Sequence, residues 1–359
     1  MTPSALRILH LVNEVVDTGN GIVNVTVDLA IDAHIRGHEV AVASSGGGFV
    51  PLLQSSGVSH YHIDFRSAPF RAFRTLRELI ADFQPDIVHA HTIAPCLLAA
   101  AVRRVPGVPD FATIATMHNV YQRSSVLMAT ADMTVGVAQS VTDVVRSRRV
   151  RSPMVATVVN GVVGSPRRAN SEYVRRDLGP RSIVTVGAVS PRKGADVLLA
   201  AFTFLAETRP DLHLWYVGNR DWEEFEPAVA NNAYSHRIHL VGLADDPASF
   251  LTGATAVALA SRREGLALSL LEAREVGAAI VATETDGARE GLDQGAAGIL
   301  VPVDDPEALA SALARVIDDP SHRDELSKHS GIGLARFSVT RMAREYECCY
   351  RQVMNRRKR

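Results

Sequence analysis

The stretch Ser261-Arg-Arg-Glu-Gly-Leu-Ala-Leu-Ser-Leu-Leu-Glu-Ala-Arg-Glu-Val-Gly277 decides the fold of this 359-residue chain. The run Ala256-Val-Ala-Leu-Ala260 precedes it and has the composition of a buried strand. Residues 261–265 are polar and include a glycine, which predicts a turn, and residues 266–276 have helical composition. The stretch therefore predicts a strand, a turn and a helix, with Glu264 before the helix and Glu272 inside it.

This arrangement is suited to a ligand that carries both phosphate and hydroxyl groups. The first amides of a helix have no intrahelical acceptor, so those of about Ala267 to Leu270, including Leu268 and Ser269, form a cradle for a diphosphate. Ionised carboxylates only accept hydrogen bonds, and the hydroxyls of a hexose and a ribose are donors to them. The stretch predicts a sugar-nucleotide site. The Glu-x7-Glu spacing alone is common and is equally compatible with a solvated helix face.

The surrounding residues distinguish between these two interpretations. They follow in a single order, namely Glu264-Gly265, Glu272-Ala273, Gly277, Ile280-Val-Ala-Thr283 and Gly287-Ala-Arg-Glu290. This string resembles the donor-site signature of retaining glycosyltransferases of family 4. The resemblance implies the GT-B fold, an α/β architecture in which two doubly wound, Rossmann-like domains face each other across an interdomain cleft.

Composition is consistent with that resemblance. The length suggests two domains, and a formal net charge of −1 gives no general attraction for nucleic acid. Three cysteines form neither a disulfide framework nor a metal motif by spacing, and no stretch of about 18 apolar residues is present. We expect a soluble, cytoplasmic protein, peripherally attached at most to the inner face of the membrane.

Short apolar runs alternate with longer helical patterns along the chain. Runs that are apolar throughout and separated by helices predict parallel sheets covered on both faces. Two such series predict two doubly wound domains. The runs of the first series are residues 8–12, 39–43, 87–91, 113–117, 133–137 and 155–159, and those of the second are 182–186, 212–217, 238–241, 256–260, 279–282 and 298–301.

The domain boundary is expected where glycines and a proline interrupt the pattern between residues 160 and 181. Residues 1–165 would form an acceptor-binding domain and residues 166–336 a nucleotide-sugar-binding domain. Met342, Tyr346, Tyr350 and Val353 have helical spacing. The resemblance implies that this final helix, in residues 337–359, packs back on the first domain.

The loop Val186-Gly-Ala-Val-Ser-Pro-Arg-Lys-Gly194 joins a predicted strand to a predicted helix. It is no Walker A motif, because Lys193 precedes the glycine and no Ser or Thr follows. A cation here neutralises a leaving diphosphate without a metal. Family members commonly carry an arginine where this chain has Ala188, and Arg192 is the candidate replacement.

Glycines and histidines mark other strand ends. In the loop of residues 17–23, Gly21 permits close approach to a phosphate, although a plain tight turn explains it equally well. The resemblance implies that His118 is the family histidine that contacts the donor sugar or its phosphate. His89 and His91 point the same way on a strand, and a hydrogen-bonded core histidine is the ordinary explanation for His89. No carboxylate lies at ligand spacing, so no metal site is expected.

The segment Pro69–Phe83 combines apolar residues at helical spacing with Arg71, Arg74 and Arg77. One interpretation is a helix packed on its own sheet with arginines in solvent. The other is an interfacial helix that meets an anionic membrane and admits a lipid-linked acceptor. Both stay open at this point.

The sequence thus predicts a retaining glycosyltransferase that moves a hexosyl unit from a nucleoside diphosphate sugar, preferably a UDP-sugar, to a hydroxyl acceptor, without cofactor or metal. Glu264, His118 and Lys193 are the candidate catalytic residues. The candidate donor-binding residues are Gly21, Arg192, Lys193, Gly265, Leu268, Ser269 and Glu272. Two alternatives are a sugar-nucleotide 2-epimerase of the same fold and a non-catalytic nucleotide-sugar sensor.

Overall fold

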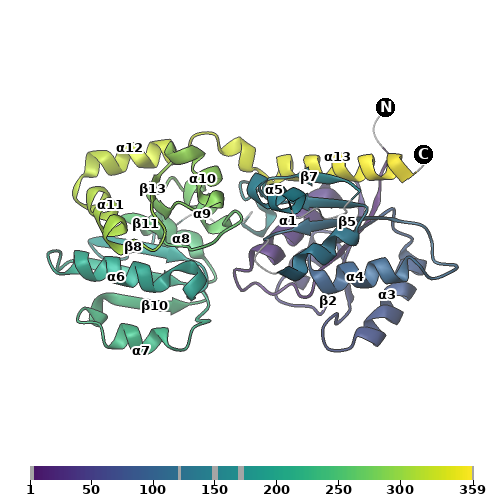
Figure 1. The fold of residues 1–359 in the computed structure, drawn as a ribbon, viewed down its shortest axis with the longest axis horizontal. Helices are drawn as coiled ribbons and strands as arrows, with labels where there is room; N and C mark the ends of the chain where they lie inside the picture. The colour runs from purple at the N-terminus through teal and green to yellow at the C-terminus, as the bar shows by residue number, and fades with distance from the viewer. Residues whose placement is uncertain (1–3, 120–122, 148–152, 169–173, 358–359) are drawn as a thin grey trace. The chain divides into compact units, whose positions relative to one another are not determined.

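The computed structural model describes residues 4–119, 123–147, 153–168 and 174–357 and divides into two compact units (Figure 1). Unit 1 comprises residues 1–169 and 337–359, and unit 2 comprises residues 170–336. The sequence had placed the divisions after residues 165 and 336. Each unit is a parallel sheet with helices, as the apolar runs predict.

The described part of unit 1 contains a parallel seven-stranded sheet in the order β3-β2-β1-β4-β5-β6-β7. The interior strand β5 (Ala112–Met117) is buried at every residue, including Thr113 and Thr116, and burial on both faces explains why its other residues are apolar. The sequence missed β3 (Ser59–His62), a polar and largely exposed edge strand that has no apolar run. The other strands are β1 (Arg7–Leu11), β2 (Glu39–Ser44), β4 (Ile87–Ala90), β6 (Met133–Gly136) and β7 (Val155–Thr157).

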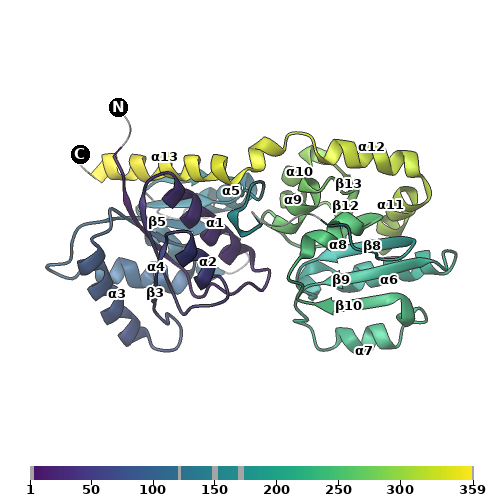
Figure 2. The same ribbon diagram turned by 180° about the vertical axis from the view of Figure 1, so that it is seen from behind.

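The final helix of the chain belongs to unit 1. Helix α13 (Val339–Arg357) packs against α1 and β5 (Figure 2). The four residues expected on its inner face are all buried, in agreement with their spacing. The other helices of unit 1 are α1 (Gly21–Ile35), α2 (Val50–Ser55), α3 (Pro69–Phe83), α4 (Ile93–Val102) and α5 (Gln139–Ser147).

The chain leaves and re-enters unit 1 through two segments that lie side by side. The amide of Val162 donates to the carbonyl of Phe337 (2.7 Å), and the amide of Val339 donates to the carbonyl of Val163 (2.9 Å). These backbone bonds tie the start of α13 to the segment that follows β7.

Residues 174–336 of unit 2 contain a parallel six-stranded sheet in the order β10-β9-β8-β11-β12-β13. Its strands are β8 (Arg181–Val186), β9 (Leu212–Val217), β10 (Ile238–Gly242), β11 (Ala256–Leu259), β12 (Ile280–Thr283) and β13 (Ile299–Val301). Its helices are α6 (Ala195–Ala206), α7 (Phe225–Ala230), α8 (Pro247–Gly253), α9 (Leu268–Glu275), α10 (Asp286–Gly291), α11 (Pro306–Asp318) and α12 (Pro320–Ser330).

The strand orders define where each unit can hold a ligand. In unit 1 the order reverses between β1 and β4, and in unit 2 it reverses between β8 and β11. Loops that leave the carboxyl ends of such strand pairs diverge and open a crevice between them. The ligand crevice of unit 1 is therefore expected at the ends of β1 and β4, and that of unit 2 at the ends of β8 and β11.

Candidate active site

In unit 2, two cationic side chains converge on one carboxylate at the β8/β11 switch point. Lys193 Nζ lies 2.5 Å from Glu264 Oε1, and Arg192 Nη1 donates to the same oxygen at 2.7 Å. Both cations lie in a 3₁₀ turn (Pro191–Lys193) after β8, and Glu264 lies in the loop after β11. The structure thus brings together three residues that the sequence had singled out separately.

Two glycines allow the loops of this site to approach closely. A Cβ at Gly194, which has a φ of +65°, would lie 1.9 Å from the carbonyl oxygen of Ala260. A Cβ at Gly287 would lie 1.8 Å from the carbonyl oxygen of Gly265. Contacts this short with backbone atoms exclude every larger residue unless a loop moves. These glycines therefore set the distance between the loops that follow β8, β11 and β12.

The Glu264 carboxylate is charged despite its surroundings. Its side chain is only 13% exposed. Burial favours the neutral acid, but the charges of Lys193 and Arg192 outweigh burial and lower the pKa of the carboxyl. The site therefore holds one anion and two cations, with a net positive charge that favours a diphosphate.

Helix α9 begins beside this cluster. Its N-cap residue Ala267 offers no side-chain cap, so the first amides, those of Leu268 and Ser269, are the donors expected at a helix N-terminus. Glu272 lies in this helix and is half-buried, whereas Glu264 precedes it. The predicted placement of the two glutamates, before the helix and inside it, is confirmed.

A small pocket lies next to the cations and is lined in part by Gly187, Ala188, Lys193 and Ser261. Ala188 leaves this wall without the arginine that the family commonly has. The guanidinium of Arg192 instead reaches Glu264 from the neighbouring turn. A guanidinium is therefore present at the site, although it comes from a different loop position.

In unit 1, Gly21 is the first residue of α1, so the helix begins within the segment that the sequence predicted as a loop of residues 17–23. The N-cap residue Asn20 accepts a hydrogen bond from the amide of Ile22 (3.0 Å). Gly19 has a φ of +71°, which explains a glycine at that turn. The Asn20 side chain thus occupies one of the amides that a phosphate would otherwise use.

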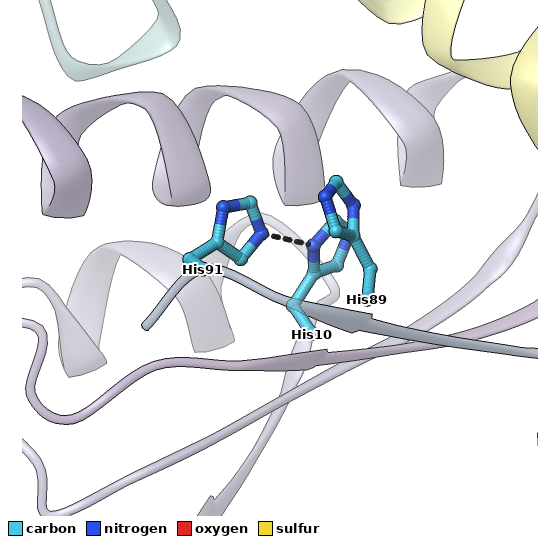
Figure 3. A group of neighbouring side chains, drawn as sticks. All are labelled: His10, His89 and His91. Atoms are coloured by element: carbon cyan, nitrogen blue, oxygen red, sulfur yellow. Dashed lines mark hydrogen bonds between the residues drawn. The ribbon is translucent and has the colours of Figure 1, made fainter. Parts of the chain in front are cut away.

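Histidines from three adjacent strands lie together at the β1/β4 switch point. Figure 3 shows His10, His89 and His91, and the ring of His118 lies 5.7 Å from that of His91. Burial lowers the pKa of His10 and of His118 to about 3, so both imidazoles are neutral. Nitrogen atoms of His10, His89 and His91 lie within 4.8 Å of one another. The sequence analysis did not place His10 in this group, because His10 lies 81 positions from His91 in the chain and the two are neighbours only through the pairing of β1 with β4.

The contacts within this cluster favour a hydrogen-bonded network over a bound cation. His10 Nδ1 and His91 Nε2 share a hydrogen bond of 3.0 Å. Both nitrogens of His89 are also engaged, Nδ1 with Tyr350 Oη (2.8 Å) and Nε2 with Thr116 Oγ1 (2.7 Å). The cluster found among the described residues includes no carboxylate, so a divalent cation there would be a buried charge without a balancing anion. These bonds confirm the interpretation of His89 as a core histidine.

Helix α3 buries one face and exposes the other. Leu76, Ile80 and Phe83 are buried in the core of unit 1, as expected for a helix packed on its own sheet. Phe70, at its first turn, is 92% exposed, and Arg71 and Arg77 are exposed on the same helix. The packed-helix interpretation thus accounts for most of α3 but not for Phe70.

The two doubly wound units are those of the GT-B fold, as the comparison with solved structures shows. The Anabaena protein HepE, solved in complex with UDP and glucose, aligns with a TM-score of 0.79 at 17% identity over 96% of this chain and 99% of that one. A glycosyltransferase from Rickettsia africae aligns with a TM-score of 0.79 at 18% identity over 98% and 99% of the two chains.

Sequence comparison places the chain within this class. Residues 19–163 match the family described as Glycosyltransferase Family 4, and residues 180–319 match Glycosyl transferases group 1. The phosphatidyl-myo-inositol mannosyltransferase of Mycobacterium tuberculosis is 30% identical over 324 residues, 83% of each chain. That of Mycolicibacterium smegmatis is 28% identical over 335 residues, 86% of this chain and 83% of the relative. The chain belongs to glycosyltransferase family 4 and is a glycosyltransferase, and the epimerase alternative has no support among these relatives.

Proposed function

We propose that this protein is a retaining glycosyltransferase that moves a hexosyl unit from a UDP-sugar to a hydroxyl acceptor. The observation that carries the proposal is the pairing of Lys193 and Arg192 with Glu264 at the β8/β11 switch point, beside the start of α9. This arrangement supplies positive charge for a diphosphate and an ionised acceptor for sugar hydroxyls. HepE, which shares the fold, was solved with UDP and glucose.

In the proposed reaction, Lys193 and Arg192 stabilise the diphosphate as it leaves. The bond between the anomeric carbon and the diphosphate oxygen breaks, and the acceptor oxygen bonds to the same face of that carbon. The acceptor proton passes to the departing phosphate, so no side chain acts as a covalent nucleophile. Glu264 accepts hydrogen bonds from the hexose hydroxyls and Glu272 from the ribose. Because the two cations balance the developing charge, the reaction requires no metal.

The remaining candidate residues complete donor binding. The amides of Gly265, Leu268 and Ser269 in unit 2 donate hydrogen bonds to the diphosphate of the donor. In unit 1, Gly21 permits the backbone of its loop to come close to the donor phosphate. His118, a neutral imidazole whose Nε2 has no hydrogen-bond partner among the described residues, contacts the donor sugar or its phosphate. A buried nitrogen without a partner is consistent with a bond that forms only when ligand is bound.

Donor consumption with and without acceptor tests this proposal. Ligand-detected NMR with a panel of nucleotide sugars identifies the donor, and turnover is then followed with a set of hydroxyl acceptors. We expect UDP-sugar binding and acceptor-dependent release of UDP. Interconversion of the donor into its 2-epimer in the absence of acceptor would refute the transfer reaction in favour of epimerisation.

We propose further that the acceptor is lipid-linked and that α3 meets an anionic membrane. Two relatives are named for phosphatidyl-myo-inositol, and α3 presents Phe70 together with Arg71, Arg74 and Arg77 at its exposed face. An exposed aromatic ring beside arginines is suited to the interface of an anionic bilayer. No described helix has the length and apolar character needed to cross a membrane.

Vesicle sedimentation tests this surface. The protein is mixed with vesicles of phosphatidylcholine alone or with added phosphatidylglycerol, and Phe70→Ser is compared with the parent. Phe204→Ser is the matched control, since Phe204 is 51% exposed on α6 of unit 2. We expect binding only to anionic vesicles and a loss in Phe70→Ser alone. Equal binding of all three proteins would exclude α3 as the contact.

A further inference from the structure

Arg262 joins three loops at the carboxyl edge of the unit 2 sheet. Its Nη1 and Nη2 donate to the two carboxylate oxygens of Asp196 (2.8 and 2.7 Å), and its Nε donates to Asp304 Oδ1 (2.6 Å). Nη1 also donates to the carbonyl of Pro191 (2.5 Å). These partners lie at the start of α6 and in the loops that follow β8 and β13, whereas Arg262 itself follows β11.

The same residue is bonded to the cationic turn through its backbone. The amide of Arg262 donates to the carbonyl of Arg192 (2.9 Å), and Arg262 precedes Glu264 by two positions. Arg262 therefore holds the turn that carries Lys193 against the loop that carries Glu264. The bidentate contact with Asp196 fixes the orientation of the guanidinium plane, which a single bond would not do.

All three guanidinium nitrogens of Arg262 donate to the protein, so this side chain is not arranged to bind a ligand directly. Asp304 has a φ of +59°, a conformation that non-glycine residues seldom adopt, and its carboxylate is bonded to Arg262. The hydrogen bond with Arg262 also lowers the pKa of Asp196, so the pair is ionised. The geometry is that of a brace between loops.

We propose that Arg262 is a positioning residue that holds Lys193 and Arg192 in place for the diphosphate. The inference rests on the proposed function, because it assigns these two cations to the donor. Without Arg262, the turn of residues 191–193 loses the bond from the guanidinium to the Pro191 carbonyl, while the pairing with Glu264 still links that turn to the loop of residues 261–264. Asp196 is left without the guanidinium that pairs with it. Both changes weaken donor binding without removing a group that touches it.

Calorimetric titration of UDP into the full-length protein tests the proposal, with the melting temperature measured in parallel. We expect Arg262→Gln to raise the Kd for UDP by about tenfold, within the range for residues that act through one network. Arg263→Gln is the matched control, because Arg263 is the neighbouring residue and its side chain is exposed. Arg263→Gln should leave the Kd for UDP within about twofold of the parent.

A double-mutant cycle with Lys193→Ala separates positioning from general destabilisation. If Arg262 acts through Lys193, the effect of Arg262→Gln on the Kd for UDP shrinks when Lys193 is already alanine. Arg262→Lys, which keeps the charge but not the planar fork, should give an intermediate Kd. If Arg262→Gln fails to fold, Asp304→Asn removes the negative charge from one contact of the brace at an exposed position and should still raise the Kd.

The outcomes distinguish this inference from the proposed function. If UDP binds to the parent and equally well to Arg262→Gln and Asp304→Asn, the positioning role is refuted while the proposed function stands. Full additivity in the cycle with Lys193→Ala also refutes it. If UDP and the other nucleoside diphosphates do not bind the parent, the proposed function fails first.

Discussion

Replacing Glu264 by glutamine should strengthen UDP binding and weaken transfer. In the structure the Glu264 carboxylate bonds to Lys193 at 2.5 Å and to Arg192 at 2.7 Å, so it competes with a diphosphate for both cations. Glutamine has nearly the same shape but no charge, and it releases the cations for the diphosphate. The hexose, however, loses an ionised acceptor whose contact strengthens as the anomeric bond breaks.

The size of the first effect follows from the exposure of each partner. Arg192 is 43% exposed, so its pairing with Glu264 is screened by solvent and contributes less than about 1 kcal/mol. Lys193 is 20% exposed and its pairing is the stronger of the two. We expect UDP alone to bind Glu264→Gln more tightly by about 1 kcal/mol, which is roughly a fivefold lower Kd. For the second effect, we expect kcat to fall by at least about tenfold.

Isothermal titration with UDP and steady-state kinetics with saturating donor measure these two quantities separately. Glu272→Gln is the comparison, because Glu272 is assigned to the ribose, which does not change during the reaction, and should act mainly on the KM for donor. A parental kcat in Glu264→Gln would refute the catalytic role. A weaker affinity for UDP in the same variant would refute the competition between Glu264 and the diphosphate.

Three further perturbations have definite expected results. Lys193→Ala should weaken UDP binding by about 1 to 3 kcal/mol, the range for a lost charge-assisted bond, and unchanged affinity in calorimetry would exclude a contact with the diphosphate. Excess EDTA should leave transfer intact; a complete loss restored by metal would reveal a metal site, for which the three-histidine cluster is the first candidate. Glu347→Gln should lower the free energy of unfolding at pH 7 by about 1 kcal/mol, because Glu347 pairs at 2.7 Å with Arg36, the C-cap residue of α1. Burial raises the pKa of Glu347, but hydrogen bonds from Arg36 and Arg351 outweigh burial and lower that pKa from 4.5 to about 2. The difference in the free energy of unfolding between variant and parent, measured by urea titration, should therefore be full above pH 4.5 and vanish as the pH falls to about 2.

The strands and the final helix could be predicted from the sequence because their signals are local. A strand buried on both faces reads as an apolar run, as in β11, where all four residues are apolar and buried, and this is visible without knowing which strand lies beside it. The inward face of α13 follows from the spacing of Met342, Tyr346, Tyr350 and Val353. Strand β3 was missed because an exposed edge strand of polar residues lacks the apolar run.

The placement of Glu264 before α9 and of Glu272 inside it was likewise a local property, since one turn and one helix start determine it. What the sequence alone determined about this protein is therefore the set of elements, their order and the candidate residues at their ends.

Only the tertiary structure decided which of those ends meet. Arg192 and Glu264 are 72 positions apart, and His10 and His91 are 81 apart. They are neighbours because β8 pairs with β11 and β1 pairs with β4, and the order of strands in a sheet leaves no periodic trace in the chain. The same holds for Arg262, whose bonds to Asp196 and Asp304 join loops that only the completed sheet brings together. The hydrophobic pattern of a sequence reflects the local structure of a few neighbouring residues. The site depends instead on contacts between loops that form only when the strands of the sheet have paired.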